Sequence, residues 1–378
     1  MRSAFLLLGL ALVAPLEAAK HRGLWFWRES GSGSPWGSDA IVGNHTLENQ
    51  TIAFFSARSI RRIYGSYSNR PVSEPATIAA WNAKLQAAGI QSQFLMSENS
   101  WIFPANHSSF LGKVQQRVID FNNAPGRTEA EKFDALHLDI EPQALGEWGS
   151  LTDAQQRDYL LLLKDTYTVV RQLFVDNGMP DFPIHADLPV WFDSHPGGSI
   201  GWTDAAERDQ WFDDISDSLT GISLMPFDRD TFSNIDSGVG WELANVPNVR
   251  VGLEADIPGT WPDVPAFHDM MEQLESAYGP SHAVDIQDYQ LWRDALAAQP
   301  IIAVAAALET VSPVGGNINF PGQTGWNYVI HHSTNLCDWR EIARERAVEN
   351  GPMTCPVEYA GPRGFWKVSR FEDLPEPP

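Results

Sequence analysis

Short apolar runs alternate along the chain with longer stretches in which apolar residues recur at helical spacing. The runs, rich in aliphatic, β-branched and aromatic residues, predict eight strands, at residues 23–27, 60–67, 90–97, 135–141, 183–188, 222–227, 249–254 and 301–305. The stretches between them include predicted helices at 75–88, 153–176 and 265–278. Eight strand-then-helix units in a chain of 378 residues predict an α/β fold, a (β/α)8 TIM barrel.

A doubly wound open sheet is the alternative arrangement of such units. That fold usually carries a glycine-rich phosphate-binding turn after its first strand, and the segment GSGSP at 31–35 lacks the spacing of that fingerprint. The pattern shows no clear eighth helix before residue 312. We therefore expect a barrel over residues 20–312.

The two ends of the chain differ from the barrel pattern. Residues 1–19 combine Arg2, an apolar run at 4–13 and small residues at 18 and 19, as a cleaved signal peptide does. No later segment holds 18 uninterrupted apolar residues, so we expect no membrane insertion and a secreted or periplasmic protein. Strand-like alternation at 326–333 and 363–371 predicts a small β-rich module over 313–378. An elaborated barrel tail is the alternative to a separate module.

Both cysteines of the chain, Cys337 and Cys355, fall in this C-terminal part. In an oxidising compartment we expect them to form a disulfide, and two buried free thiols are the alternative. The segment YVIHHSTNLCDW resembles a β-module found at the C-termini of some secreted bacterial hydrolases.

Charge and composition limit the classes of molecule that the protein could bind. Asp and Glu number 48 against 26 Lys and Arg, which gives a formal charge of −22 and argues against a nucleic-acid partner. The 15 Trp residues are a high number: Trp either fills a core or offers a flat surface, and indole faces stack on sugar rings. No metal-ligand motif or nucleotide-binding loop appears, so we expect no cofactor and no metal.

The fourth predicted strand, in the segment FDALHLDIEP, carries the clearest candidate chemistry. A strand has a side-chain period of two, so His137, Asp139 and Glu141 share one face and should point into the barrel at its C-terminal end. Ionisable groups facing one interior are costly unless they bond to one another and function together. A satisfied structural network is the alternative interpretation.

The segment FDALHLDIE resembles the fourth-strand signature D-x-x-D-x-D-x-E of the family 18 glycoside hydrolases, the chitinase-like barrels. Asp134, Asp139 and Glu141 match three of its four acidic positions. His137 stands at the remaining one, the second, where the family has Asp. The segment LMPFDRD at 224–230 resembles the family's M-x-Y-D, with Asp228 matching. Phe at 227 replaces the Tyr of that motif, and residues 307–310 lack the Trp that usually ends the last strand.

The resemblance implies a retaining reaction assisted by the substrate. In it Glu141 is the general acid/base, and Asp139 orients an N-acetyl group that attacks the anomeric carbon. The residues themselves allow a second mechanism, because Glu254 ends the seventh predicted strand. In that mechanism Glu254 is the nucleophile and Glu141 remains the acid/base. A salt-bridge role for Glu254 at the barrel mouth is the alternative.

We expect further residues near the strand ends to bind substrate: His137, Asp187, Asp228, Trp25, Trp27, Trp101 and Trp191. Asp187 is suited to bond a sugar hydroxyl or to pair with Arg229 or His185. Together these features predict a secreted glycoside hydrolase that acts on a polysaccharide or oligosaccharide. A non-catalytic carbohydrate-binding barrel derived from a glycosidase is the main alternative, and a purely structural secreted protein is another.

Overall fold

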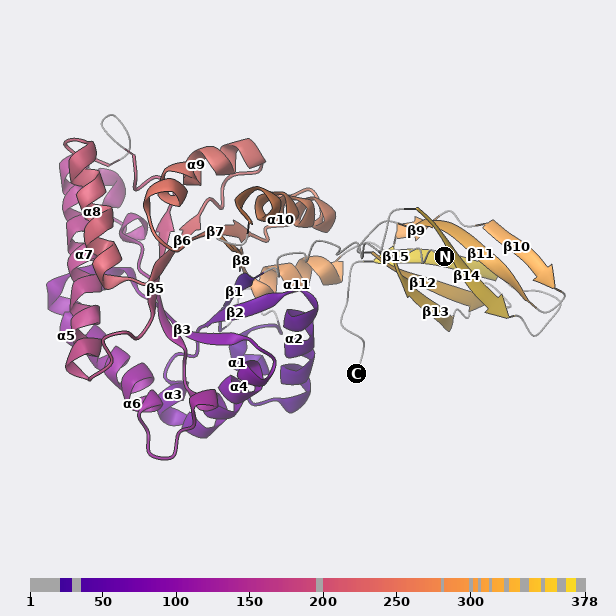
Figure 1. The fold of residues 1–378 in the computed structure, drawn as a ribbon, viewed down its shortest axis with the longest axis horizontal. Helices are drawn as coiled ribbons and strands as arrows, with labels where there is room; N and C mark the ends of the chain where they lie inside the picture. The colour runs from indigo at the N-terminus through magenta and orange to yellow at the C-terminus, as the bar shows by residue number, and fades with distance from the viewer. Residues whose placement is uncertain are drawn as a thin grey trace, which may run out of the picture.

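The structure is a computed structural model, and it describes residues 21–28, 35–194, 200–279, 282–298, 302–304, 307–312, 315–322, 326–333, 340–347, 351–358 and 365–371. Eight parallel strands close into a barrel in chain order (Figure 1). They are β1 (Arg22–Phe26), β2 (Ile60–Gly65), β3 (Gln91–Ser97), β4 (Ala135–Asp139), β5 (Ile184–Pro189), β6 (Gly221–Met225), β7 (Val249–Glu254) and β8 (Val284–Gln287). Strand β1 pairs with both β2 and β8, which closes the barrel and confirms the predicted fold class.

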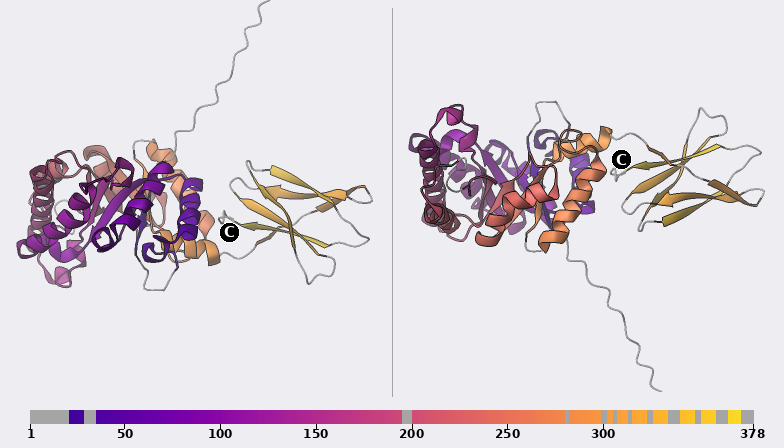
Figure 2. Two further views of the ribbon diagram at one scale, coloured as in Figure 1. Left: turned by 90° about the horizontal axis from the view of Figure 1, so that it is seen from below. Right: turned by 90° about the horizontal axis from the view of Figure 1, so that it is seen from above.

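Helices surround the barrel on its outside (Figures 1 and 2). They are α1 (Ser38–Ile41), α2 (His45–Ala57), α3 (Arg70–Ser73), α4 (Pro75–Ala87), α5 (Pro104–Val114), α6 (Asp120–Asn122), α7 (Asp153–Asp176), α8 (Ala205–Ser218), α9 (Phe232–Asn245), α10 (Val264–Tyr278) and α11 (Tyr289–Ala298). Shorter helical turns are η1 (Asn99–Ile102), η2 (Gln115–Ile119), η3 (Glu129–Glu131), η4 (Pro142–Ala144) and η5 (Trp148–Ser150). Of the helices described, none has the length and hydrophobicity that crossing a bilayer requires.

Helix α7 shows how local sequence fixes an element. Thr152 caps its first turn, and the side chain of Gln155 bonds back to the Thr152 backbone in a capping box. The helix ends just before Gly178, whose positive φ of 73° suits glycine. The buried residues recur at helical spacing and face the barrel: Leu160, Leu163, Thr166, Tyr167, Val170 and Phe174.

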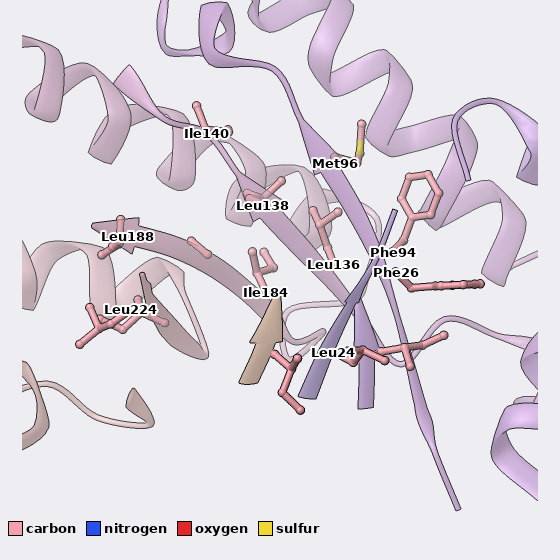
Figure 3. Packing of buried hydrophobic residues seen from close by; sticks show 14 of the residues in the cluster. Leu24, Phe26, Phe94, Met96, Leu136, Leu138, Ile140, Ile184, Leu188 and Leu224 are labelled. Atoms are coloured by element: carbon pink, nitrogen blue, oxygen red, sulfur yellow. The ribbon is translucent and has the colours of Figure 1, made fainter. Parts of the chain in front are cut away.

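The main hydrophobic core lies between the strands and the helices. Leu136, Leu138 and Ile140 alternate along β4 and its end, and all three point outward into this layer (Figure 3). Equivalent outward positions on the other strands, such as Leu24 and Phe94, complete it. The predicted outward face of β4 is therefore confirmed, and the opposite face is left for polar residues inside the barrel.

The eighth barrel strand differs from the sequence prediction. It is β8, at Val284–Gln287, and it is followed by α11, whereas the apolar segment at 302–304 forms a strand outside the barrel. Strand β8 is only four residues long and carries Asp285 on its inward face, so it lacks the apolar signal of the other strands. The expected Trp at the end of the last strand is also absent at this corrected position, where Gln287 is followed by Asp288.

The C-terminal part of the chain forms two antiparallel sheets (Figure 2). Their strands are β9 (Ile302–Val304), β10 (Ala307–Ser312), β11 (Gly315–Gly322), β12 (Asn327–Ser333), β13 (Arg340–Arg346), β14 (Gly351–Glu358) and β15 (Phe365–Phe371). One sheet has the order β10-β11-β14 and the other β13-β12-β15-β9. Phe320 of the first sheet packs on Tyr328 of the second, with ring centroids 5.0 Å apart, so the sheets share a core.

Several expectations fall on residues that the structure does not describe. The expected signal peptide at 1–19 and Cys337 are among them, so secretion and the disulfide stay predictions. Cys355 lies buried in the core between the two sheets. The division of the chain after residue 312 also stays a prediction, and strands β9 and β10 pair with strands that follow that point.

Candidate active site

Inward-facing residues of the strands fill the barrel with polar and aromatic side chains. His137 and Asp139 of β4 are 0% and 8% exposed and project into this interior, as the alternation predicted. His137 stacks on Tyr64 of β2, with ring centroids 3.9 Å apart. The interior of the barrel is therefore a packed site and contains no pore at this level.

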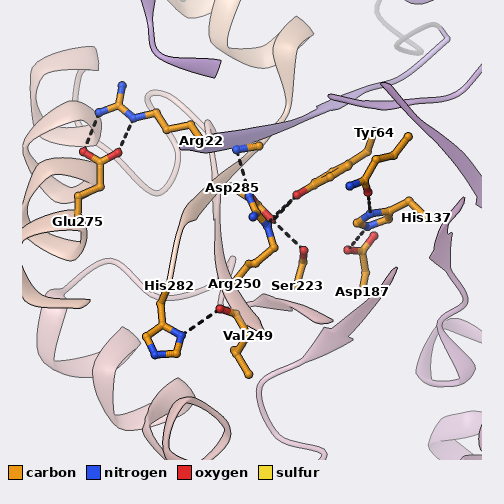
Figure 4. A network of polar contacts seen from close by, with 12 residues as sticks. Arg22, Tyr64, His137, Asp187, Ser223, Val249, Arg250, Glu275, His282 and Asp285 are labelled. Carbon is orange, nitrogen blue, oxygen red and sulfur yellow. Dashed lines mark hydrogen bonds and ion pairs between the residues drawn. The ribbon is translucent and has the colours of Figure 1, made fainter. Parts of the chain in front are cut away.

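Asp187 of β5 bonds to residues of two other strands inside the barrel, and Figure 4 shows its contact with His137 of β4. Its Oδ1 lies 2.7 Å from Nε2 of His137, and its Oδ2 accepts a hydrogen bond from the indole N–H of Trp25 at 3.0 Å. Nδ1 of His137 lies 3.1 Å from Oε1 of Gln93 on β3. The suggested partners Arg229 and His185 are therefore not the ones that Asp187 contacts.

Burial determines the protonation of His137 and Asp187. Burial lowers the pKa of His137 to about 3, so its imidazole is neutral and carries one N–H. One of its two neighbours must then supply a hydrogen to the other ring nitrogen. Burial raises the pKa of Asp187 well above its usual range, and nearby Asp285 and Glu141 raise it further. A protonated Asp187 meets that requirement.

A buried ion pair lies below these residues, toward the N-terminal ends of the strands (Figure 4). Asp285 of β8 pairs with Arg250 of β7 and accepts hydrogen bonds from the Tyr64 hydroxyl at 2.6 Å and the Ser223 hydroxyl at 2.8 Å. The backbone N–H of Gly23 also donates to Asp285 at 3.0 Å. A buried pair is stable only when such bonds satisfy its remaining atoms, so this network supports the site above it.

Asp139 and Glu141 lie at the C-terminal end of β4. Burial raises the pKa of Asp139 well above its usual range, and the charge of Glu141 and a hydrogen bond with Glu141 raise it further. Asp139 therefore holds its proton more tightly than an exposed carboxyl group does. Its Oδ1 is buried and has no hydrogen-bond partner among the described residues, although such atoms are normally satisfied.

Glu141 is partly exposed and held in place by its neighbours. Its backbone N–H donates to Oδ1 of Asn99 at 2.9 Å, and its Oε2 accepts from the amide of Gln143 at 3.0 Å. The chain turns into η4 directly after it, with Pro142 at the first helical position. A carboxyl group at a strand end, reachable from solvent and fixed by two bonds, is suited to proton transfer.

Glu254 ends β7 on the same inward face as Gly252. It is half-buried, and burial raises its pKa, as do Asp256 and Asp288. A Cβ atom at Gly252 would lie 3.0 Å from the ring of Phe227 and 3.3 Å from that of Trp25, so glycine makes room for these rings. Glu254 therefore lies next to the aromatic rings inside the barrel.

The predicted aromatic residues fall into two groups. Trp25 is buried inside the barrel, with the partly buried Trp27 and Phe227 packed against its cluster. Trp101 is only 6% exposed and stacks on Phe110, with centroids 4.2 Å apart. Trp191 is partly buried against Trp148 at 6.1 Å. In the cluster around Trp25, Trp27 is the tryptophan with an accessible surface. Stacking of the four tryptophans on sugar stays a prediction.

The remaining motif residues lie apart from this centre. Asp228 follows β6 and is exposed. Asp134 precedes β4, where its Oδ2 accepts the Ser92 backbone N–H at 2.7 Å, so it holds the start of two strands together. The sequence analysis missed Gln93. Gln91, Gln93 and Ser97 are polar residues at alternate positions of β3, and this pattern could have indicated that Gln93 faces the interior of the barrel. Among the described residues, no group of three His, Cys, Asp or Glu side chains is placed to hold a metal.

The structure is similar to solved structures of other proteins. No protein-family model matches the sequence, and no curated protein sequence does. A glucosidase from Croceicoccus marinus has a TM-score of 0.44 and 9% identity, over 96% of this chain and 98% of that chain. The spore cortex-lytic enzyme SleL of Bacillus megaterium has a TM-score of 0.44 and 8% identity, over 74% of each chain.

A family 18 chitinase from Cycas revoluta is also similar, with a TM-score of 0.39 and 11% identity, over 62% of this chain and 68% of that chain. It belongs to the family that the β4 motif resembles. At these identities and TM-scores the likeness carries no argument about reaction or substrate.

Proposed function

We propose that the protein is a glycoside hydrolase with a retaining mechanism, in which Glu141 is the general acid/base. The observation that carries this proposal is the pair at the end of β4. Asp139 is buried, has a raised pKa and is hydrogen-bonded to Glu141, and Glu141 reaches solvent. Two carboxyl groups that share a proton at the open end of a barrel are arranged for acid catalysis followed by base catalysis.

The proton follows a short route in this proposal. Glu141 donates a proton to the glycosidic oxygen as the bond to the leaving group breaks, and later takes a proton from the attacking water. Asp139 lies behind it, and the proton that the two carboxyl groups share is on Glu141 when the transfer occurs. The unpartnered Oδ1 of Asp139 is available to accept a hydrogen bond from an N–H or O–H group of the sugar.

Two groups remain candidates for the attack on the anomeric carbon. An N-acetyl group of the substrate, oriented by Asp139, would make the reaction substrate-assisted. Glu254, at the end of β7 and half-buried, would instead form a glycosyl-enzyme. A fluorinated glycoside should label Glu254 only in the second mechanism, and a thiazoline inhibitor should bind only in the first.

The first experiment measures release of reducing sugar from a panel of polysaccharides, including chitin and peptidoglycan. We expect the native chain to release sugar from at least one, and Glu141→Gln to lose roughly 100-fold or more of that rate. Gln keeps the size and the Asn99 contact of the backbone, so folding should not change. Asp213→Asn, an exposed site on α8, is the matched control.

The alternative class, a carbohydrate-binding barrel without activity, has its own result in this experiment. Native and Glu141→Gln proteins would then bind a glycan equally and release nothing. Equal hydrolysis by both proteins would instead contradict the role of Glu141 while leaving the enzyme class intact.

A further inference from the structure

A cavity of about 210 Å³ lies at the C-terminal end of β3. Its basic and hydroxyl lining is contributed by Arg28, Ser66, Ser68, Ser97, Lys113 and Arg117. Ser97 is the link to the proposed active site, because it pairs with Asp139 across β3 and β4 and its hydroxyl bonds to that carboxyl group. A group bound in the cavity would therefore lie next to the acid pair.

The cavity is basic in a strongly acidic chain. Lys113 and Arg117 both line it, and no carboxylate of the described residues lies within ion-pair distance of either. Nε of Arg117 is buried without a hydrogen-bond partner in the described part of the chain. A guanidinium donor left unsatisfied is costly, and an oxyanion is its natural partner.

The other charged residues that line the cavity leave its net charge positive. Arg28 is committed to Asp39, with Nη2 to Oδ2 at 2.9 Å. Glu98 also lines the cavity, and its carboxylate accepts the backbone N–H of Ser100. The two cations on α5 and η2 therefore face one carboxylate that is already engaged. This arrangement attracts a single negative group.

Lys113 is held in place by an aromatic contact before any ligand arrives. The Lys113 ammonium lies 5.3 Å from the centre of the Trp101 ring, and that ring is stacked on Phe110. Pre-positioned groups lose little entropy on binding. This gives Trp101 a part in the site that differs from stacking on sugar.

We propose that this cavity binds one acidic substituent, a carboxylate, sulfate or phosphate, on the sugar next to the cleaved bond. The inference rests on the proposed function for the position of the sugar. The volume is below the roughly 300–1,000 Å³ of drug-sized ligand sites, so it suits one substituent or one ring. The overall charge of −22 disfavours a polyanion, so the acidic group is an isolated one on an otherwise neutral glycan.

The test is calorimetric titration of the full-length protein with four monosaccharides: glucose, glucuronate, glucose 6-sulfate and glucose 6-phosphate. We expect at least one acidic sugar to bind roughly tenfold tighter than glucose, with the preference falling as salt rises. The acidic sugar that binds best identifies the substituent. Equal binding of all four, or a preference for glucose, overturns the proposal.

Two variants locate the effect. Lys113→Met should remove the preference for the acidic sugar, and Arg117→Lys, which keeps the charge but loses the planar fork, should reduce it. Lys132→Met changes the charge equally but lies before β4, where it pairs with Glu129, and should leave the preference unchanged. A loss of preference in this control as well would mean that the effect is one of net charge, and the proposal would fall.

Binding and hydrolysis separate this proposal from the previous one. A preference for acidic sugars in a protein that hydrolyses no glycan would support the cavity and contradict the hydrolase. Hydrolysis that depends on Glu141, without any preference among the monosaccharides, would support the hydrolase and contradict the cavity.

Discussion

Asp187 is the residue on which the inner part of the site depends. It is 1% exposed and accepts from Trp25 of β1 while contacting His137 of β4, so one carboxyl group on β5 bonds three strands together. A buried carboxylate would be costly here, and a protonated carboxyl can both donate and accept. The contacts therefore favour the neutral acid that its raised pKa indicates.

Two substitutions at this position should differ clearly. Asp187→Ala leaves Trp25 and His137 with unpaired buried groups and should lower the free energy of unfolding by roughly 2–4 kcal/mol. Asp187→Asn keeps one acceptor and one donor in the same shape, so we expect a loss below about 1.5 kcal/mol. Urea denaturation at neutral pH measures both. An Asn variant as unstable as the Ala variant would show that Asp187 is ionised in the native protein.

At the scale of elements, α9 contains a buried carboxyl group that the proposed mechanism does not use. Glu242 is 0% exposed, and neither of its carboxylate oxygens has a hydrogen-bond partner among the described residues. Burial raises its pKa to about 8, and Asp193 adds to the shift. The helix therefore packs with this carboxyl group neutral at and below neutral pH.

This shift predicts a pH dependence of stability. Between pH 4.5 and about 8 the folded chain keeps a proton that the unfolded chain has released, so the free energy of unfolding falls as pH rises through this range. Glu242→Gln removes the titration and should be more stable than the native chain by roughly 2–4 kcal/mol above pH 8, with little difference near pH 4. Thermal unfolding at several pH values measures this.

The exposed Asp213→Asn variant is the control for the Glu242 comparison. It should follow the native curve at every pH. A Glu242→Gln curve parallel to the native one would show that Glu242 is satisfied by a contact that keeps it charged.

The success of the sequence prediction also varies by element. Seven barrel strands and α7 carry strong patterns of their own, and the structure places them within a few residues of the expected ranges. Strand β8 has only four residues, and one of them is the buried Asp285. The residue that pairs with Asp285, Arg250, is 35 positions away in the sequence. Its identity follows from tertiary contacts that no local pattern contains.

The candidate site divides in the same way. The inward direction of His137 and Asp139 follows from the period of a strand and was predictable from one segment. Their partners Gln93 and Asp187 come from other strands, brought together by the closure of the barrel. The sequence indicates which residues turn inward, and the fold decides which of them meet.

At the scale of the whole molecule, strand pairing bears on where the chain divides. Strand β9 pairs with β15, and β10 pairs with β11, so both belong to the C-terminal sheets although they precede residue 313. Helix α11 packs on β1 and β8 and belongs to the barrel. We propose that the boundary lies between α11 and β9.

Two truncations test this boundary. A chain ending at residue 299 keeps every barrel strand and its covering helices, so we expect it to stay soluble and to unfold in one cooperative transition. A chain ending at residue 312 adds IIAVAAALETVS, an apolar segment at 301–312 whose strands have lost their partners, and unpaired strand edges promote aggregation. Light scattering and calorimetry compare the two. A soluble longer chain beside an aggregating shorter one would place the boundary after residue 312 and would show that β9 and β10 stabilise the barrel.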